Sequence, residues 1–168
     1  MKSAAFLDRD GVINVEKGYV YRIEDFDWIK GAKEAIKHLN SIDYYVFIVS
    51  NQSGISRGYY DKEDVENLHI FINQELKEHN AHIDDFFYSP YHPDFHSKYP
   101  ELSHLRKPNT GMLEIALEKW KFDKKRSFMI GDSESDIECA TRFGIKSYLF
   151  KEDDLFKFIK NIEILSYY

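Results

Sequence analysis

Short apolar segments alternate with helical patterns along the whole chain, and this alternation limits the folds that the chain can adopt. Buried strands are predicted where apolar, β-branched and aromatic residues form short runs, at residues 3–8, 44–51, 85–90, 127–132 and 146–150. Helices are predicted where apolar side chains recur at helical spacing, at residues 31–41, 61–79, 109–120, 135–144 and 153–162. Strands separated by helices are typical of βαβ units. We therefore expect a single α/β domain over residues 1–168, with a Rossmann-like parallel sheet covered by helices on both faces.

Composition excludes several classes of function. The net charge is −6 and no dense run of Lys and Arg is present, which disfavours binding to nucleic acid. No run of 18 apolar residues occurs, and the first apolar stretch is too short for a secretory signal. The single cysteine, Cys139, has no second cysteine for an internal disulfide, which agrees with a reducing compartment. We expect a cytoplasmic monomer that acts on a small molecule and binds neither nucleic acid nor a membrane.

Polar residues stand where three of the predicted strands end. Asp8 and Asp10 follow the first strand, Ser50 and Asn51 close the second, and Asp132 follows the fourth. With 15 Asp in the chain, one Asp-x-Asp is expected by chance, so the first pair means little alone. In parallel α/β sheets, however, ligands bind outside the carboxyl ends of the strands. The coincidence of three strand ends indicates a site at that edge of the sheet.

Phosphoryl transfer is the chemistry that these residue types favour. A carboxylate such as Asp8 can attack phosphorus and form an aspartyl phosphate. Mg²⁺ prefers one or two carboxylates together with phosphate oxygens, and Asp8 and Asp132 could hold it. Asp10 could protonate the leaving oxygen and later activate water. Ser50 and Lys107 could bind the non-bridging oxygens and stabilise the charge of the transition state.

Four stretches of the sequence resemble the four motifs of the haloacid dehalogenase superfamily. They are, in order, FLDRDG, SNQSG, RKPNTGM and IGDSESD. The resemblance implies that Asp8 is the nucleophile, Asp10 the acid/base, Ser50 the phosphate binder and Lys107 the charge balancer. It also implies that Mg²⁺ is held by Asp8, Asp132 and a main-chain oxygen of Asp10. Because the stretch between Asp10 and Ser50 is too short for a helical cap domain, we expect a member without a large cap.

A subfamily is indicated by the stretches DRDGVIN, GYV, SNQSGISRG and RKPNTGM, which look like those of the D,D-heptose 1,7-bisphosphate 7-phosphatases. The resemblance implies removal of the 7-phosphate in a bacterial pathway to lipopolysaccharide or capsule heptose. The substrate contacts carried over by position are Glu16, Lys17, Gly18, Tyr19, Ser50, Asn51, Gln52, Ser53, Arg106 and Lys107. Arg106 also suits a second phosphate chemically, because a guanidinium binds phosphate in a bidentate manner. Arg57 either reaches the substrate or is solvated.

The chain departs from the subfamily in one loop. A zinc site of the form Cys-x-His and Cys-x-Cys usually precedes Arg-Lys-Pro, but the corresponding positions here are Ser89, Tyr91, Ser103 and Leu105. Two hydroxyls, a phenol and a leucine do not make a tetrahedral zinc site. We expect no zinc, and a loop held by the packing of Tyr88, Tyr91, Phe95, Tyr99 and Leu102. Because this loop faces the substrate in the family, the α or β anomer stays open.

Other interpretations also stay open. Histidinol-phosphate phosphatases have a closely similar pattern, and polynucleotide 3′-phosphatases also resemble it, although the acidic charge disfavours a nucleic-acid substrate. A domain that only binds phosphate is expected to lack Asp8 or Asp10, and both are present. Asp136 is expected both to cap its helix and to support the metal site.

Overall fold

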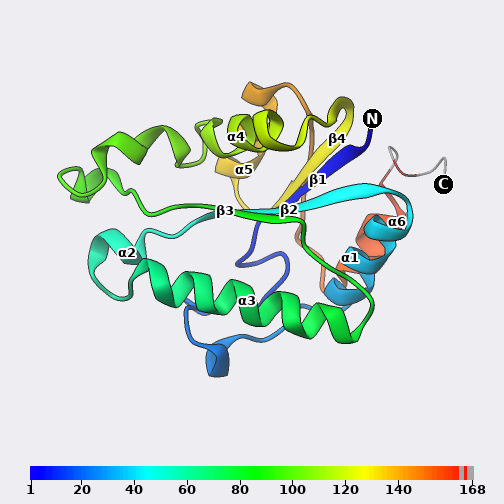
Figure 1. Ribbon diagram of the computed structural model, residues 1–168, viewed down its shortest axis with the longest axis horizontal. Helices are drawn as coiled ribbons and strands as arrows, with labels where there is room; N and C mark the ends of the chain where they lie inside the picture. Colours follow the sequence, from blue (N-terminus) through cyan, green and yellow to red (C-terminus); the bar gives the residue numbers. More distant parts are fainter. Residues whose placement is uncertain (163–164, 166–168) are drawn as a thin grey trace.

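Five parallel strands form one sheet in the order β3-β2-β1-β4-β5 (Figure 1). The computed structural model describes residues 1–162 and 165. The strands are β1 (Ser3–Leu7), β2 (Tyr44–Asn51), β3 (Asp85–Ser89), β4 (Asp123–Gly131) and β5 (Lys146–Leu149). Because β1, β2 and β4 are neighbours at the centre of the sheet, the residues that follow them emerge at one edge. The predicted parallel α/β sheet is confirmed.

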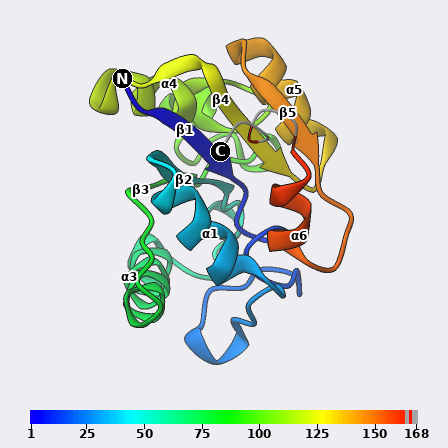
Figure 2. The ribbon, with the colours of Figure 1, turned by 90° about the vertical axis from the view of Figure 1, so that its right-hand side faces the viewer.

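Helices cover both faces of the sheet (Figures 1 and 2). One face carries α1 (Ala32–Ser41), α3 (Lys62–Glu78) and α6 (Leu155–Lys160), and the other carries α4 (Gly111–Trp120) and α5 (Glu134–Phe143). Strand side chains alternate between the two layers: Ala5 and Leu7 of β1 pack with the first, Ala4 and Phe6 with the second. Burying each large apolar side chain contributes about 1.5–3 kcal/mol, so both layers hold the strand ends in place.

The observed elements begin and end within two residues of their predicted bounds, with one exception. Strand β4 begins at Asp123 rather than at residue 127, because Asp123 pairs with Ser3 of β1 ahead of an exposed polar stretch that shows no apolar pattern. The four-residue helix α2 (Gly54–Arg57) was not predicted. Between residues 10 and 50 the chain forms only the short 3-10 helix η1 (Ile23–Asp25), α1 and most of β2, so no large cap is present there. The prediction that Tyr167 and Tyr168 fray lies outside the described residues.

Residues 89–106, here called the distal loop, extend from the end of β3 to the residue before Lys107. The loop contains two 3-10 helices, η2 (Pro93–Phe95) and η3 (Pro100–Leu105), and lies on the left of Figure 1 above α2. Tyr88 and Tyr99 pack against a small cluster formed by Ile55, Tyr60 and Val65, which confirms their predicted packing role. The distal loop is thereby fixed against α2 and the start of α3. None of the described helices combines the length and apolar character needed to cross a membrane.

Candidate active site

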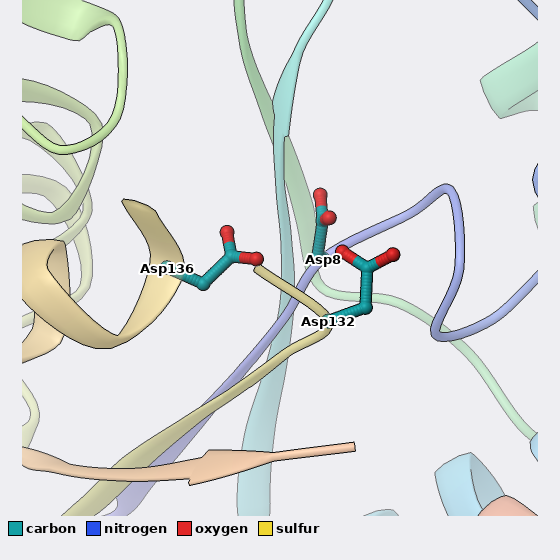
Figure 3. A group of neighbouring side chains, drawn as sticks. All are labelled: Asp8, Asp132 and Asp136. Atoms are coloured by element: carbon teal, nitrogen blue, oxygen red, sulfur yellow. The ribbon is translucent and has the colours of Figure 1, made fainter. Parts of the chain in front are cut away.

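Three carboxylates meet at the carboxyl edge of the sheet. Asp8 follows β1, Asp132 follows β4, and Asp136 reaches them from the first turn of α5 (Figure 3). One oxygen from each lies within 4.8 Å of the others. Gly11 allows the approach, because a Cβ there would lie 2.1 Å from Asp132 Oδ2, and its backbone φ of +86° also suits glycine. The predicted proximity of Asp8 and Asp132 is therefore observed, and Asp136 joins them.

Lys107 joins this group from the segment between η3 and α4. Its buried Nζ lies 2.8 Å from Asp8 Oδ1 and 2.6 Å from Asp136 Oδ1, and it donates to the Val49 carbonyl at 2.8 Å. Burial lowers the pKa of Lys107, but the two carboxylates outweigh burial and leave the pKa above its usual value. Burial raises the pKa of Asp8 to about 8, against the opposing effect of Lys107. The ammonium of Lys107 is thus shared between two buried carboxylates, while Asp132 forms no ion pair with it.

The donor set fits a hard divalent cation. Asp136 already accepts hydrogen bonds from Ser133 N at 3.1 Å and Ser133 Oγ at 2.7 Å, in addition to its ion pair with Lys107. Asp136 thus supports the start of α5 and the position of Lys107, whereas Asp8 and Asp132 remain for a cation. Burial, followed by the neighbouring carboxylate of Asp136, raises the pKa of Asp132.

Asp10 is held by three side chains, and the sequence analysis singled out only one of them, Gln52. Asp10 accepts hydrogen bonds from Asn14 Nδ2 at 3.0 Å, Gln52 Nε2 at 3.1 Å and Arg9 NH2 at 3.0 Å. The Arg9 side chain is fully buried, and its NH2 also donates to the Val20 carbonyl. In the sequence, Arg9 is marked only by its place between Asp8 and Asp10. The middle residue of the Asp-x-Asp motif is thus the buried counter-ion of its second carboxylate.

Two adjoining cavities open at this edge. The phosphate cavity, of about 130 Å³, is lined by Asp8, Asp10, Glu16, Ser50, Asn51, Lys107, Asp132, Ser133 and Ser135. The outer cavity, of about 360 Å³, shares Asp10, Glu16 and Asn51 with it and adds Gly18, Tyr19, Gln52, Ser53 and Tyr60. Ser50 is buried, and its Oγ accepts from Gln52 Nε2 at 2.6 Å. The two cavities together place a phosphate-sized space next to a larger polar one.

Two of the predicted substrate residues line neither cavity. Lys17 forms an exposed ion pair with Asp27. Arg106 is the last residue of the distal loop and donates from NH1 to the Tyr91 carbonyl at 3.2 Å. The other predicted contact residues each line at least one of the two cavities. They are Glu16, Gly18, Tyr19, Ser50, Asn51, Gln52, Ser53 and Lys107.

The distal loop brings together no set of metal ligands within the described part of the chain. Among the described residues, one group of His, Cys, Asp or Glu side chains has ligand atoms close enough to share an ion. That group is Asp8, Asp132 and Asp136 at the sheet edge, outside the distal loop. Ser89 is buried, and its Oγ has no hydrogen-bond partner. The expected absence of zinc stays a prediction.

Comparisons with known proteins agree with this geometry. The HAD-hydrolase-like family model matches residues 104–154. The chain is 42% identical over 164 residues to the D-glycero-beta-D-manno-heptose-1,7-bisphosphate 7-phosphatase of Rhodopseudomonas palustris, covering 97% of this chain and 91% of that protein. It is also 42% identical over 144 residues to the D-glycero-alpha-D-manno-heptose-1,7-bisphosphate 7-phosphatase of Photorhabdus laumondii, covering 84% of this chain and 78% of that protein.

Solved structures show the same relationship. The D,D-heptose 1,7-bisphosphate phosphatase of B. bronchiseptica, in complex with magnesium and phosphate, superimposes with a TM-score of 0.80 at 27% identity, covering 95% of this chain and 85% of that chain. A HAD-like phosphatase of Mesorhizobium loti gives a TM-score of 0.79 at 31% identity, covering 88% of this chain and 72% of that chain. The chain therefore belongs to the haloacid dehalogenase-like hydrolases, within the family of the D-glycero-D-manno-heptose-1,7-bisphosphate 7-phosphatases.

Proposed function

We propose that this protein is a magnesium-dependent phosphatase that removes the 7-phosphate from D-glycero-D-manno-heptose 1,7-bisphosphate through an aspartyl-phosphate intermediate. The observation that carries the proposal is the contact of Lys107 with Asp8 in a cavity that Asp10, Ser50 and Asp132 also line. The names of the related proteins supply the substrate. The proposal includes action as a monomer in the cytoplasm, as the sequence predicts.

The first step joins Asp8 to the phosphoryl group. A carboxylate oxygen of Asp8 attacks phosphorus while the bond from phosphorus to the sugar oxygen breaks, and the electron pair stays on that oxygen. Asp10 gives its proton to the leaving oxygen. Lys107 Nζ and Ser50 Oγ hold the non-bridging oxygens, where negative charge must be stabilised in the transition state. The contact of Lys107 Nζ with Asp8 places the positive charge of the ammonium beside the nucleophilic carboxylate before the substrate arrives.

The second step releases phosphate. Asp10, now a carboxylate, takes a proton from water as the water oxygen attacks phosphorus, and the bond from phosphorus to Asp8 breaks. Arg9, Asn14 and Gln52 hold Asp10 in one orientation for both proton transfers. Asp8, Asp132 and a main-chain oxygen of Asp10 would hold Mg²⁺, which would supply positive charge to offset that of the carboxylates and the phosphate.

The outer cavity suits a single sugar. Its lining offers the carboxylate of Glu16 and the side chains of Gln52, Ser53 and Tyr60, which can form hydrogen bonds with sugar hydroxyls. Its volume of about 360 Å³ falls within the range of small-molecule sites. Relatives of both anomeric specificities match at 42% identity, so identity alone favours neither anomer.

The test is phosphate release with Mg²⁺ from the α and β anomers of the heptose bisphosphate, with histidinol phosphate alongside. We expect kcat/KM to favour one heptose anomer by on the order of 10⁴, the scale on which polar sites discriminate. A higher kcat/KM for histidinol phosphate than for either heptose anomer would overturn the proposed substrate. Asp8→Asn should abolish turnover in a folded protein, and an active Asp8→Asn variant would overturn the mechanism.

A further inference from the structure

Tyr60 is the buried start of a chain of hydrogen bonds that ends at two side chains of the candidate active site. It lies just before α3 and lines the outer cavity, and its hydroxyl donates to Gln52 Oε1 at 2.6 Å. The other end of the same amide, Gln52 Nε2, donates to Ser50 Oγ at 2.6 Å and to Asp10 Oδ2 at 3.1 Å. One phenol is therefore connected, through one amide, to the phosphate binder and to the acid/base.

The orientation of the Gln52 amide follows from its neighbours. Two donors approach Oε1, the hydroxyl of Tyr60 and, at 3.4 Å, NH2 of Arg9. Burial raises the pKa of Tyr60 above its ordinary value, so the phenol keeps its hydrogen and acts as a donor. In a reversed amide, Oε1 would face the ionised carboxylate of Asp10, and two acceptors would meet without a hydrogen between them. The Tyr60 hydroxyl thus fixes which end of Gln52 faces the reacting groups.

This orientation determines what the Ser50 hydroxyl can do. A hydroxyl carries one hydrogen, and it can accept as well as donate. Because Ser50 Oγ accepts from Gln52 Nε2, its own hydrogen is left for another acceptor, and Ser50 lines the phosphate cavity. A reversed amide would present its oxygen to Ser50 and take that hydrogen. The contact of Tyr60 with Gln52 therefore keeps the Ser50 hydrogen available for a phosphate oxygen.

The Tyr60 ring is held in place on several sides. A Cβ at Gly54 of α2 would lie 2.1 Å from a ring carbon of Tyr60, so glycine permits this close approach. Tyr21 stacks on the ring, with centroids 4.8 Å apart and planes 17° apart. The ring also packs against Ile55 and Val65. Packing of this kind fixes the side-chain rotamer and therefore the position of the hydroxyl.

We propose that Tyr60 is a positioning residue for phosphoryl transfer, which orients Gln52 so that Ser50 donates to the phosphate and Asp10 stays aligned. The inference rests on the proposed function and deepens it, because Tyr60 acts through Gln52 without touching the reacting atoms. The competing role is a sugar contact, since Tyr60 also lines the outer cavity. The two roles differ in which kinetic constant depends on the hydroxyl.

The test removes one oxygen atom with Tyr60→Phe, which keeps the packed ring. For the full-length protein with Mg²⁺, kcat and KM are measured separately on heptose 1,7-bisphosphate and on p-nitrophenyl phosphate, which has no sugar. Tyr88→Phe is the matched control. Tyr88 packs in the same cluster as Tyr60, and its hydroxyl donates to Glu66 at 3.0 Å, away from both cavities. The melting temperature of each protein is recorded alongside.

We expect Tyr60→Phe to lower kcat about tenfold on both substrates, as for one hydrogen bond of ordinary strength, and to leave KM within about twofold. Tyr88→Phe should keep the wild-type kcat. A higher KM for the heptose bisphosphate alone would reveal a sugar contact and overturn the inference. A lower melting temperature with unchanged kcat on both substrates would reveal a structural role and would also overturn it.

A double-mutant cycle tests the route through Gln52. Gln52→Met keeps the length of the side chain and removes both ends of the amide. In that background Tyr60→Phe should cause no further loss of kcat, because the group through which Tyr60 acts is gone. An equal loss of kcat in both backgrounds would mean that Tyr60 acts through another contact, and the inference would fall.

The proposed function and this inference can fail separately. If only p-nitrophenyl phosphate is hydrolysed and Tyr60→Phe lowers its kcat, the positioning role stands and the heptose substrate falls. If the heptose bisphosphate is hydrolysed and Tyr60→Phe keeps the wild-type kcat, the substrate stands and the positioning role falls. A wild-type protein that hydrolyses neither phosphate would overturn both.

Discussion

The side-chain amide of Asn51 forms two hydrogen bonds with the backbone of Lys107. Asn51 Oδ1 accepts from Lys107 N at 2.9 Å, and Asn51 Nδ2 donates to Lys107 O at 3.1 Å. The end of β2 thereby fixes the backbone point from which the lysine side chain crosses to Asp8. Asn73 of α3 makes the same pair of bonds with Ile83, at 2.8 and 3.0 Å, away from the two cavities.

The first prediction uses this pair of asparagines. Asn51→Ala should lower kcat by about 10²-fold, because a displacement of about 1 Å at a catalytic group has an effect of that order. It should also lower the free energy of unfolding by about 1–3 kcal/mol. Asn73→Ala should lose similar stability and keep its kcat. Steady-state kinetics and urea unfolding of both variants provide the check, and equal losses of kcat would show that Asn51 does not position Lys107.

The second prediction concerns the buried ion pair of Arg9 and Asp10. Arg9→Ala should lower the free energy of unfolding by about 3–5 kcal/mol, because it leaves the Asp10 carboxylate without its buried cation. In an Asp10→Asn background the same change should cost less, since the amide has no charge to balance. Urea unfolding of the four proteins in this cycle gives the comparison. Equal costs in both backgrounds would mean that Arg9 acts only through packing.

The third prediction is a loss of stability in acid caused by His69. Burial, with a contribution from Arg9, lowers the pKa of His69 to about 3, and its ring stacks on Phe86 at 4.3 Å. Above about pH 6.5 the ring is neutral in both the folded and the unfolded protein and has no effect on stability. Between pH 6.5 and about 3 only the unfolded chain binds the proton, so stability falls by up to about 1.4 kcal/mol per pH unit.

His69→Phe should therefore reduce the loss of unfolding free energy between pH 7 and pH 5. His96→Phe is the control, because His96 is exposed. Urea unfolding at both pH values measures the difference. If His69→Phe loses as much stability as the wild-type protein over this range, the neutral buried ring is not the cause.

The fourth prediction concerns metals. The protein as purified should contain no stoichiometric zinc, because Ser89, Tyr91, Ser103 and Leu105 offer no thiolate or imidazole ligand. Chelation should remove the phosphatase activity and Mg²⁺ should restore it, since Asp8 and Asp132 need a hard cation beside the substrate phosphate. Elemental analysis and activity after chelation check both statements. One tightly bound zinc per chain would contradict the interpretation of the distal loop.

The fold was largely predictable because side-chain periodicity is a local property. Ala4, Ala5, Phe6 and Leu7 form an uninterrupted apolar run in the sequence. Such a run predicts a strand that is buried on both faces, and these side chains do pack alternately into the two layers. The strand-end residues were predictable for a related reason, since all strands of a parallel sheet end at one edge. The start of β4 was not predictable from the sequence. Its first residues are polar and half-buried or exposed, so they show no apolar pattern, although Asp123 pairs with Ser3 of β1.

Individual hydrogen bonds between side chains far apart in the sequence were not predictable. Asn51 and Lys107 are 56 positions apart, and Arg57 and His92 are 35 positions apart. The hydrogen-bonding partners of a side chain depend on three-dimensional packing, which residue types and spacing do not specify. For the same reason Arg9 was overlooked as a variable position within a motif, and Asn51 was assigned to the substrate rather than to Lys107.

The arrangement of the strands also bears on which parts of the site open first. Asp8, Ser50 and Asp132 lie at the ends of the three central strands, whereas Arg57, His92 and Arg106 lie in or beside the distal loop. Backbone amides in central strands exchange with solvent only on near-global unfolding, whereas loop amides exchange through local openings. Brief openings of the loop would therefore leave the reacting carboxylates assembled. Changes of sequence in the loop can accordingly alter which molecules are accepted without disturbing the chemistry at the sheet.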